Sequence, residues 1–254
     1  MPYDITSPTN ERIKRLIRLR EKRHRNAEGV FVVEGPRMID RAIESGLKPL
    51  EIYIDDPTSE LANADALMVE PTVLSRASYR SQSEGVIAVF EQFPLTLDQI
   101  DLDDTPLVLA AESIEKPGNL GAMLRTADAF GANGFVAIGE TVDVFNPNVI
   151  RASTGALFTV PVALCGLDDF GLWLEDHSIR LIAASPGSQN TLWDTDMKGA
   201  SALLVGAEDT GLSKSATQLC DSLVAIPMFG LSDSLNTSVS LALLAYEAVR
   251  QRVG

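Results

Sequence analysis

The side chains best placed for chemistry lie in three turns in the C-terminal half of the sequence. Each turn follows an apolar stretch of strand type, and ligands of α/β proteins bind at the carboxyl ends of strands. The candidates are Asn119 and Arg125 with the first turn, Glu208 with the second, and Ser234 and Asn236 with the third. These turns are rich in backbone donors and hydroxyls and poor in His and Cys, which fits chemistry by positioning.

The second turn resembles a phosphate-binding loop only in part. Gly206 and Gly211 have the spacing of the two glycines in G-x-x-x-x-G-K-[ST], but Leu212 stands where the lysine is required. Without that charge, hydrolysis of a nucleoside triphosphate is disfavoured. The sequence also contains no G-x-G-x-x-G and no G-x-S-x-G, so it supports neither a standard dinucleotide-binding fold nor a nucleophile elbow.

Each of these signals also has a purely structural explanation. A glycine in a loop needs no function, and an arginine on a helix, such as Arg125, is usually a surface charge. Ser234 or Asn236 could cap the last helix, an interaction worth about 1 kcal/mol. The third turn nevertheless carries more polar side chains than one cap needs, and burying them beside an apolar helix would be costly unless they bind something.

Metal chemistry is not predicted. The chain has two cysteines, Cys165 and Cys220, which lie 55 residues apart, and two histidines, His24 and His177. This spacing gives neither a metal-ligand cluster nor a disulfide framework.

The turns belong to a predicted parallel sheet. Near-continuous apolar stretches, which are typical of strands buried on both faces, occur at residues 107–111, 135–138, 181–184, 202–205 and 223–226. Helices are expected between and after them, at residues 120–130, 149–157, 168–176 and 235–252. The alternation predicts an α/β fold with a mostly parallel sheet.

A smaller α/β domain is expected ahead of this sheet. A helix capped by Asn10 should run to about His24, followed by strands at residues 30–33, 51–54 and 86–90, a helix opened by Pro36 and weaker helical stretches at 59–64 and 72–77. Residues 92–106 contain two prolines and four acidic residues, typical of a linker. We therefore place the domains at residues 1–95 and 106–254, with the linker at 96–105.

Charge is distributed unevenly along the chain. The net charge is -14, but residues 1–25 hold eight of the 21 basic residues and three of the 35 acidic ones, so this segment is +5 and the remainder -19. Such asymmetry indicates contact between the basic segment and a nucleic acid, although a solvated helix face would look the same. Lys14, Arg18, Arg20 and Arg25 are the candidates for binding RNA phosphates.

Length and hydropathy add further limits. At 254 residues the chain is long enough for two modest domains. The first residues lack the apolar core of a secretory signal, and no 18-residue apolar run occurs. A cytoplasmic protein is expected.

Taken together, the three turns resemble the SpoU-type, TrmH-like branch of the SPOUT RNA ribose methyltransferases. The motif residues run from Asn119 to Ala127, from Gly206 to Leu212, and over Ile226–Met228, Ser234–Val239 and Glu247–Arg252; the segment 146–155 is similar as well. Residues 1–95 are more loosely similar to the RNA-recognition domain often fused ahead of it. Thr237 is a small departure, because the family often has Val there.

The resemblance implies a deep trefoil knot in the C-terminal domain, S-adenosylmethionine as the methyl donor and a homodimer with structured RNA as partner. Carried over by position, the cofactor-binding residues are Gly206, Gly211, Ile226, Met228 and Leu235. The catalytic or site-shaping residues are Asn119, Arg125, Glu208, Ser234 and Asn236.

The implied reaction is in-line methyl transfer to a ribose 2′-hydroxyl. Because a guanidinium with a pKa above about 12 is a poor base at neutral pH, we expect Arg125, held by Asn119, to grip a phosphate and stabilise the developing alkoxide. Glu208 could serve the reaction or merely cap its loop.

Ribosomal RNA is favoured as substrate, with transfer RNA as the alternative. The family also includes enzymes that confer antibiotic resistance. A non-catalytic RNA-binding protein and a metabolic enzyme acting on a small molecule are the competing classes.

Overall fold

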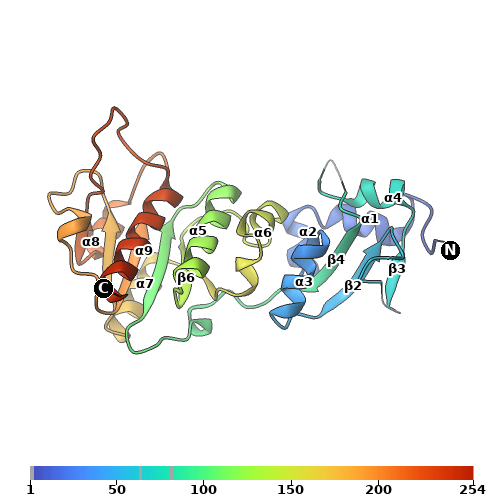
Figure 1. The fold of residues 1–254 in the computed structure, drawn as a ribbon, viewed down its shortest axis with the longest axis horizontal. Helices are drawn as coiled ribbons and strands as arrows, with labels where there is room; N and C mark the ends of the chain where they lie inside the picture. The colour runs from blue at the N-terminus through green and yellow to red at the C-terminus, as the bar shows by residue number, and fades with distance from the viewer. Residues whose placement is uncertain (1–2, 63–64, 81–82, 254) are drawn as a thin grey trace. The chain divides into compact units, whose positions relative to one another are not determined.

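A computed structural model describes residues 3–62, 65–80 and 83–253 (Figure 1). The chain forms two compact units. The first unit consists of residues 1–93 and 143–158, and the second of residues 94–142 and 159–254. The segment Asp143–Phe158 therefore packs with the first unit, although the predicted domain limits assign it to the second domain.

The first unit is built on a four-stranded mixed sheet in the order β1-β4-β2-β3. β4 (Val86–Glu91) pairs antiparallel with both β1 (Val30–Glu34) and β2 (Pro49–Ile54), and β3 (Ala66–Met68) runs parallel to β2. The helices of this unit are α1 (Glu11–Arg18), α2 (Lys22–Glu28), α3 (Pro36–Glu44), α4 (Pro71–Ala77) and α6 (Pro147–Ser153).

The predicted helix from Asn10 to about His24 is in fact two helices. Asn10 caps α1 as expected, its Oδ1 accepting from the Arg12 N–H at 2.9 Å. The chain turns after α1, and Arg25 from α2 donates to the carbonyls of Leu19 and Arg20, both at 2.7 Å. A side chain thus satisfies carbonyls that a continuous helix would have paired along its own backbone.

Of the other elements predicted in the first unit, five are confirmed and one is wrong. The strands at 30–33, 51–54 and 86–90 and the helices opened by Pro36 and at 72–77 are confirmed by β1, β2, β4, α3 and α4. The helix predicted at 59–64 is wrong as far as residue 62, because that stretch forms turns; residues 63 and 64 lie outside the described residues.

The segment around α6 adds aromatic packing to the first unit. The ring of Phe31 in β1 stacks on Phe90, Phe145 and Phe158, with centroid separations of 5.6, 5.0 and 6.1 Å. α6 ends at Ser153, earlier than predicted, because Thr154 has a left-handed backbone with φ 51° and Gly155 follows at φ 97°.

The second unit confirms the predicted parallel α/β sheet. Its six strands, all parallel, lie in the order β10-β8-β9-β5-β6-β7. Their bounds are β5 Leu107–Glu112, β6 Gly134–Ile138, β7 Val162–Cys165, β8 Arg180–Ala184, β9 Ser201–Val205 and β10 Ser222–Val224. The longer helices are α5 (Pro117–Ala129), α7 (Leu167–Asp176) and α9 (Thr237–Val253), with the short α8 (Lys214–Leu219) between β9 and β10.

Sequence periodicity missed two short strands and one short helix, β3, β7 and α8, which offer too few residues for a pattern. The knot implied by the resemblance is not tested by the strand order and stays a prediction. No helix among the described residues is both long and apolar enough to cross a membrane.

Candidate active site

The carboxyl ends of three neighbouring strands, β10, β8 and β9, enclose a pocket of about 360 Å³ in the second unit. We refer to it as the main pocket. It is lined by residues 184–186 at the end of β8, 205–211 at the end of β9, and by Ile226, Met228, Ser234, Leu235, Thr237 and Ser240 after β10. The site lies where the sheet topology places ligands.

The loop after β9 is too tight to carry a side chain at Gly206. A Cβ there would lie 2.2 Å from the carbonyl carbon of Gly211 and 2.3 Å from the Leu212 nitrogen. Ala207 and Gly211 exchange two backbone hydrogen bonds of 3.0 Å, and Gly211 has φ +66°. The Thr237 hydroxyl at the start of α9 donates to the Gly206 carbonyl at 2.9 Å. Both glycines are therefore required by the backbone of the pocket wall.

Three predicted catalytic residues meet in one hydrogen-bonded group. The Asn236 Nδ2 donates to Asn119 Oδ1 at 3.2 Å and to Glu208 Oε1 at 2.9 Å, while Lys116 Nζ donates to Glu208 Oε2. We call these four residues the polar cluster. They come from the start of α5, the loop after β9 and the start of α9. All three sequence motifs therefore meet at one edge of the sheet, as predicted.

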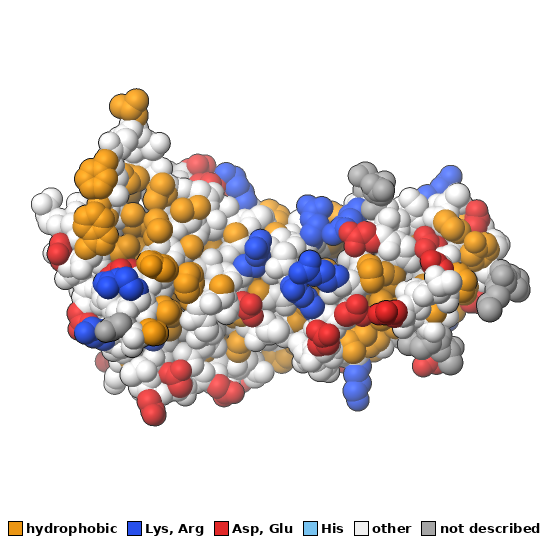
Figure 2. Space-filling model, viewed as in Figure 1, with side chains coloured by type: hydrophobic (Ala, Val, Ile, Leu, Met, Phe, Trp, Pro, Cys, Tyr) orange, Lys and Arg blue, Asp and Glu red, His pale blue; other side chains and the backbone are white. Residues whose placement is uncertain are grey.

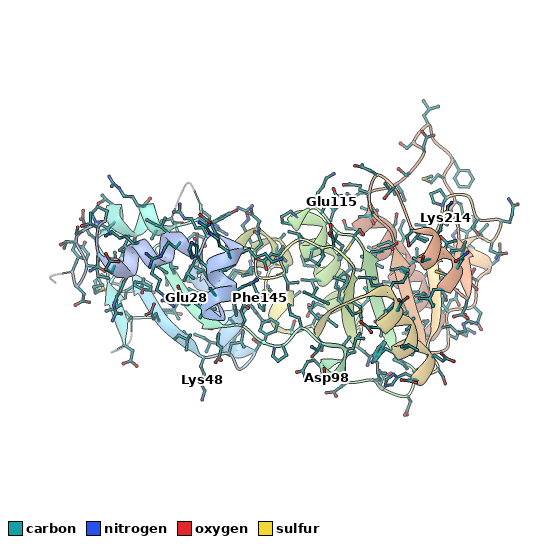
Figure 3. All side chains as sticks on the ribbon, turned by 180° about the vertical axis from the view of Figure 1, so that it is seen from behind. Glu28, Lys48, Asp98, Glu115, Phe145 and Lys214 are labelled. Carbon is teal, nitrogen blue, oxygen red and sulfur yellow. The ribbon has the colours of Figure 1, made fainter. Side chains whose placement is uncertain are left out.

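The polar cluster adjoins the main pocket. Lys116, Asn119 and Glu208 line a smaller hollow of about 20 Å³ that shares Gly206, Glu208 and Thr237 with the main pocket. Figure 3 labels Glu115, in the turn that leads to Lys116 and α5. A molecule bound in the main pocket would therefore lie next to the polar cluster.

Glu208 is held in its charged form. The hydrogen bond from Lys116 lowers the pKa of the Glu208 carboxyl, and further bonds from Asn236 and Asn119 act in the same direction. The pKa of Lys116 is raised in turn by Glu208. Because both groups lie at the surface, this pair contributes to orientation and charge more than to stability. Lys116 was missed by sequence reasoning; its only signal is its position in the same turn as Asn119.

Both polar atoms of the Asn236 side chain, Oδ1 and Nδ2, form hydrogen bonds within the protein. Its Oδ1 accepts from the backbone N–H of Ser238 at 3.0 Å and from the Ser238 hydroxyl at 2.6 Å, while its Nδ2 serves Asn119 and Glu208. Asn119 uses its Oδ1 toward Asn236, and its side-chain amide also donates to the Glu208 carboxylate. The two amide groups of the polar cluster are therefore held in fixed orientations.

Arg125 is not part of this group. It is exposed on α5, and no described contact joins it to Asn119. Arg125 lies six positions after Asn119, which puts their side chains about 120° apart around the helix. The prediction that Asn119 holds Arg125 is therefore wrong: Asn119 is bound to Asn236 instead.

The predicted cofactor residues all line the main pocket: Gly206, Gly211, Ile226, Met228 and Leu235. Ser234 lines it too, but it makes no described bond to the polar cluster. Ser185 and Pro186 were missed, although a polar turn after an apolar strand was the signal that identified the other loops.

Comparison with known proteins identifies the family. Residues 106–246, more than half of the chain, match the model of the SpoU rRNA Methylase family, and residues 10–88 match the MRM3-like substrate binding domain. The chain belongs to the SpoU rRNA methylase family. The resemblance drawn from the three turns is confirmed.

Similarity to known proteins extends over nearly the whole length of this SpoU methylase. A 23S rRNA (uridine(2479)-2′-O)-methyltransferase of Streptomyces viridochromogenes is 31% identical over 92% of this chain and 88% of its own. The solved structure of AviRb from the same organism, in complex with the cofactor AdoMet, is 30% identical with a TM-score of 0.89, covering 96% of this chain and 99% of that one. An AdoMet-bound rRNA methyltransferase from Sinorhizobium meliloti is 30% identical with a TM-score of 0.90, covering 97% of both chains.

The four predicted RNA-binding residues of this SpoU methylase differ in whether their charged groups are exposed or bound within the protein. Arg25 is 1% exposed, and its guanidinium contacts the Asp143 carboxylate besides two carbonyls, so it does not fit the predicted role. Arg20 donates to the carbonyls of Arg76 and Ser78. Lys14, paired with Glu11 at the surface, and the exposed Arg18 are the two that face solvent.

Proposed function

We propose that this chain transfers a methyl group from S-adenosylmethionine to a ribose 2′-hydroxyl of ribosomal RNA, in the cytoplasm. The observation that carries the proposal is the position of the polar cluster at the rim of the main pocket, where a donor and an acceptor would meet. The relatives described above are named as enzymes of this reaction or carry AdoMet in their structures.

The main pocket suits an S-adenosylmethionine molecule. Its volume of about 360 Å³ lies in the range of small-ligand sites. Ile226, Met228 and Leu235 supply apolar surface, and the tight Gly206–Gly211 loop brings backbone groups within reach because no Cβ intervenes. When bound, the molecule would supply an electrophilic methyl group on a sulfonium.

The protein's own residues then have to bring an oxygen into line with that methyl group and hold it there. Asn236 and Glu208 fix the orientation of the Asn119 amide beside the main pocket, where it would help to position the substrate. Glu208 keeps Asn236 in place and, since its pKa is lowered, remains a carboxylate at neutral pH. A carboxylate with a lowered pKa is a weak base, so we assign Glu208 to orientation.

Arg125 supplies the fixed positive charge in this scheme, gripping a phosphate of the target nucleotide and stabilising the developing alkoxide. Since it does not line the main pocket of its own subunit, we propose that the enzyme acts as a homodimer in which Arg125 serves a site at the subunit interface. A cluster of exposed apolar side chains on and before α9 supports this assembly: Phe229 is 91% exposed, Leu231 103%, Val239 46% and Tyr246 56% (Figure 2).

The test is methyl transfer from tritiated S-adenosylmethionine to a 23S rRNA transcript and to intact large ribosomal subunits, with transfer RNA as the comparison. We expect tritium in ribosomal RNA, at a nucleotide whose 3′ phosphodiester bond resists alkaline hydrolysis. Label in transfer RNA alone would replace the proposed substrate. A chain that binds neither S-adenosylmethionine nor its demethylated product would refute the function itself.

A further inference from the structure

The segment 146–155 belongs to no part of the active site described above, yet it forms a distinctive surface in the first unit. Here α6 packs against β1, and Asn148 and Arg151 of α6 line a shallow hollow of about 20 Å³. The hollow is completed by Met38 of α3, Glu34 of β1, and Tyr79 and Arg80 after α4. We call this the Tyr79 surface.

Tyr79 presents an exposed ring that is held at both ends. The residue is 39% exposed. Its backbone N–H donates to the Glu34 carboxylate, and its hydroxyl accepts from the Asn148 Nδ2 at 3.2 Å. Glu34 also accepts from the Ser78 hydroxyl at 2.7 Å, which fixes the turn. A ring fixed in this way loses little conformational freedom when a planar group stacks on it.

Among the described residues, arginines without an ion-pair partner lie at the hollow, where Arg151 joins its lining, and on α3, which contributes Met38 to it. In the described part of the chain, Arg151, Arg37 and Arg41 have no carboxylate partner. Arg41 lies over Gly155, where a Cβ would meet its Cδ at 2.6 Å, so α3 and the end of α6 are in direct contact. Arg37 lies one helical turn before Arg41 on the same side of α3. These arginines differ from Arg25, whose charge faces Asp143 inside the unit.

We propose that the Tyr79 surface binds an unpaired nucleotide of the RNA substrate. The base stacks on the Tyr79 ring, and Arg151, which lines the same hollow, contacts a flanking phosphate. Unpaired bases are recognised in this manner because every base has a π-face, whereas bases within an RNA duplex are stacked on one another. The hollow is too small to enclose a base, so the base lies on the surface. The inference rests on the proposed function, since it takes RNA as the substrate.

Substitution of Tyr79 tests the stacking contact in the full-length protein. The probe is a fluorescently labelled 23S rRNA transcript, with affinity and the KM for RNA in methyl transfer as readouts. Tyr79→Ala should weaken binding about tenfold, whereas Tyr79→Phe should retain it, because the ring supplies the contact. Tyr3→Ala is the matched control: Tyr3 is 37% exposed and should be silent.

Several outcomes would overturn the proposal. Unchanged affinity for Tyr79→Ala, or equal losses for Tyr79→Ala and Tyr79→Phe, would exclude stacking, and so would failure of the parent chain to bind the transcript. A parent chain that binds RNA through Tyr79 but transfers no methyl group would refute the proposed function and leave this site standing. Thermal unfolding distinguishes a binding defect from misfolding.

Charge removal gives a second, independent readout. Arg151→Gln should lower the slope of log affinity against log salt concentration by about 1, as expected for loss of one phosphate contact. Lys48→Gln removes an exposed charge from the same unit, at a residue labelled in Figure 3, and should leave the slope unchanged. Equal slopes for the parent and Arg151→Gln would exclude Arg151 from the RNA contact.

In the Tyr79→Trp variant, the added indole should lose fluorescence on binding RNA, beyond any change in the parent chain. A purely structural role of residue 79 would not produce this signal. Absence of added quenching at saturating RNA would contradict stacking at this position.

Discussion

The basic segment of the first unit and the loop motifs of the second unit drew attention in the sequence for the same reason, an excess of polar or charged residues. In the first unit, much of that excess is turned inward: Arg25 and Arg20 bind backbone carbonyls, and Arg15 pairs with Glu28 and Glu51. In the second unit, the polar groups meet beside an open pocket of about 360 Å³. Residue type therefore indicates function only where the chain topology leaves a polar group facing free space.

The physical origin of the difference is the architecture. A parallel sheet gathers loops from distant parts of the sequence at one edge, so residues 119, 208 and 236 meet without being neighbours in the chain. The basic segment instead turns back on itself between α1 and α2, which creates free carbonyls at Leu19 and Arg20 that Arg25 then satisfies. Both regions therefore carry an excess of polar or charged residues, but only in the second unit do these residues meet beside a pocket.

The largest expected effect is on stability, from Arg25→Met. Removing the guanidinium leaves Asp143 without its buried partner and uncaps two carbonyls, which should lower the free energy of unfolding by about 3–5 kcal/mol. Chemical denaturation measures it, with Arg18→Met as the exposed control. If Arg25→Met lost RNA affinity while keeping full stability, the contrast between the two regions would break down.

Arg125 should behave in the opposite manner. Because it is exposed and has no described partner in its own subunit, Arg125→Ala should leave unfolding almost unchanged. Turnover should fall on the order of a hundredfold, the effect of removing one donor from a developing oxyanion. Arg125→Lys should recover little if bidentate geometry matters. Nearly full activity of Arg125→Lys would mean that Arg125 acts only as a point charge.

Gly206→Ala sharpens the comparison within the second unit. The added methyl group would collide with the Gly211 backbone and force the loop apart, an overpacking of about 1–3 kcal/mol that should weaken S-adenosylmethionine binding ten- to a hundredfold. Titration calorimetry measures this affinity. Gly187→Ala is the matched control, since a Cβ there meets nothing within 4 Å. Equal affinities in both variants would mean that the tight loop is not part of the cofactor site.

The spacing of Gly206 and Gly211 could be recognised in the sequence because the backbone at these two positions requires glycine. The parallel sheet, five of its six strands and the three loops that carry the polar cluster were predicted for the same reason: buried strands show as apolar runs and loops as polar ones. The partners within the site were not, since Lys116 and the bond between Asn119 and Asn236 depend on side-chain directions that no periodicity encodes. The fate of Arg25 likewise depended on Asp143, which lies 118 residues further along the chain.

Lys116→Met probes the electrostatics of the polar cluster. Lys116 lowers the pKa of Glu208, so in the parent chain the carboxylate interaction is present at neutral pH and is lost only as pH falls through that lowered pKa. Without Lys116 the Glu208 pKa should rise, and the acid limb of the rate profile should move to higher pH. Lys198→Met, which removes an exposed lysine elsewhere in the unit, should leave the profile in place. An acid limb that stays fixed in Lys116→Met would assign it to another group.

The smallest expected effects concern the two basic residues of α1 that do face solvent. Lys14→Gln and Arg18→Gln should each lower the salt slope of RNA binding by about 1 and weaken affinity only a few-fold, uniformly across RNA sequences, because a phosphate contact carries charge but no base information. Arg20→Gln is the informative comparison. Its guanidinium is bound to the Arg76 and Ser78 carbonyls, so this change should disturb the turn that carries Tyr79 and lower stability without changing the slope. A full unit of slope lost on Arg20→Gln would show that a side chain engaged within the unit can still contact phosphate, and would remove the distinction between inward-facing and solvent-facing charge in this segment.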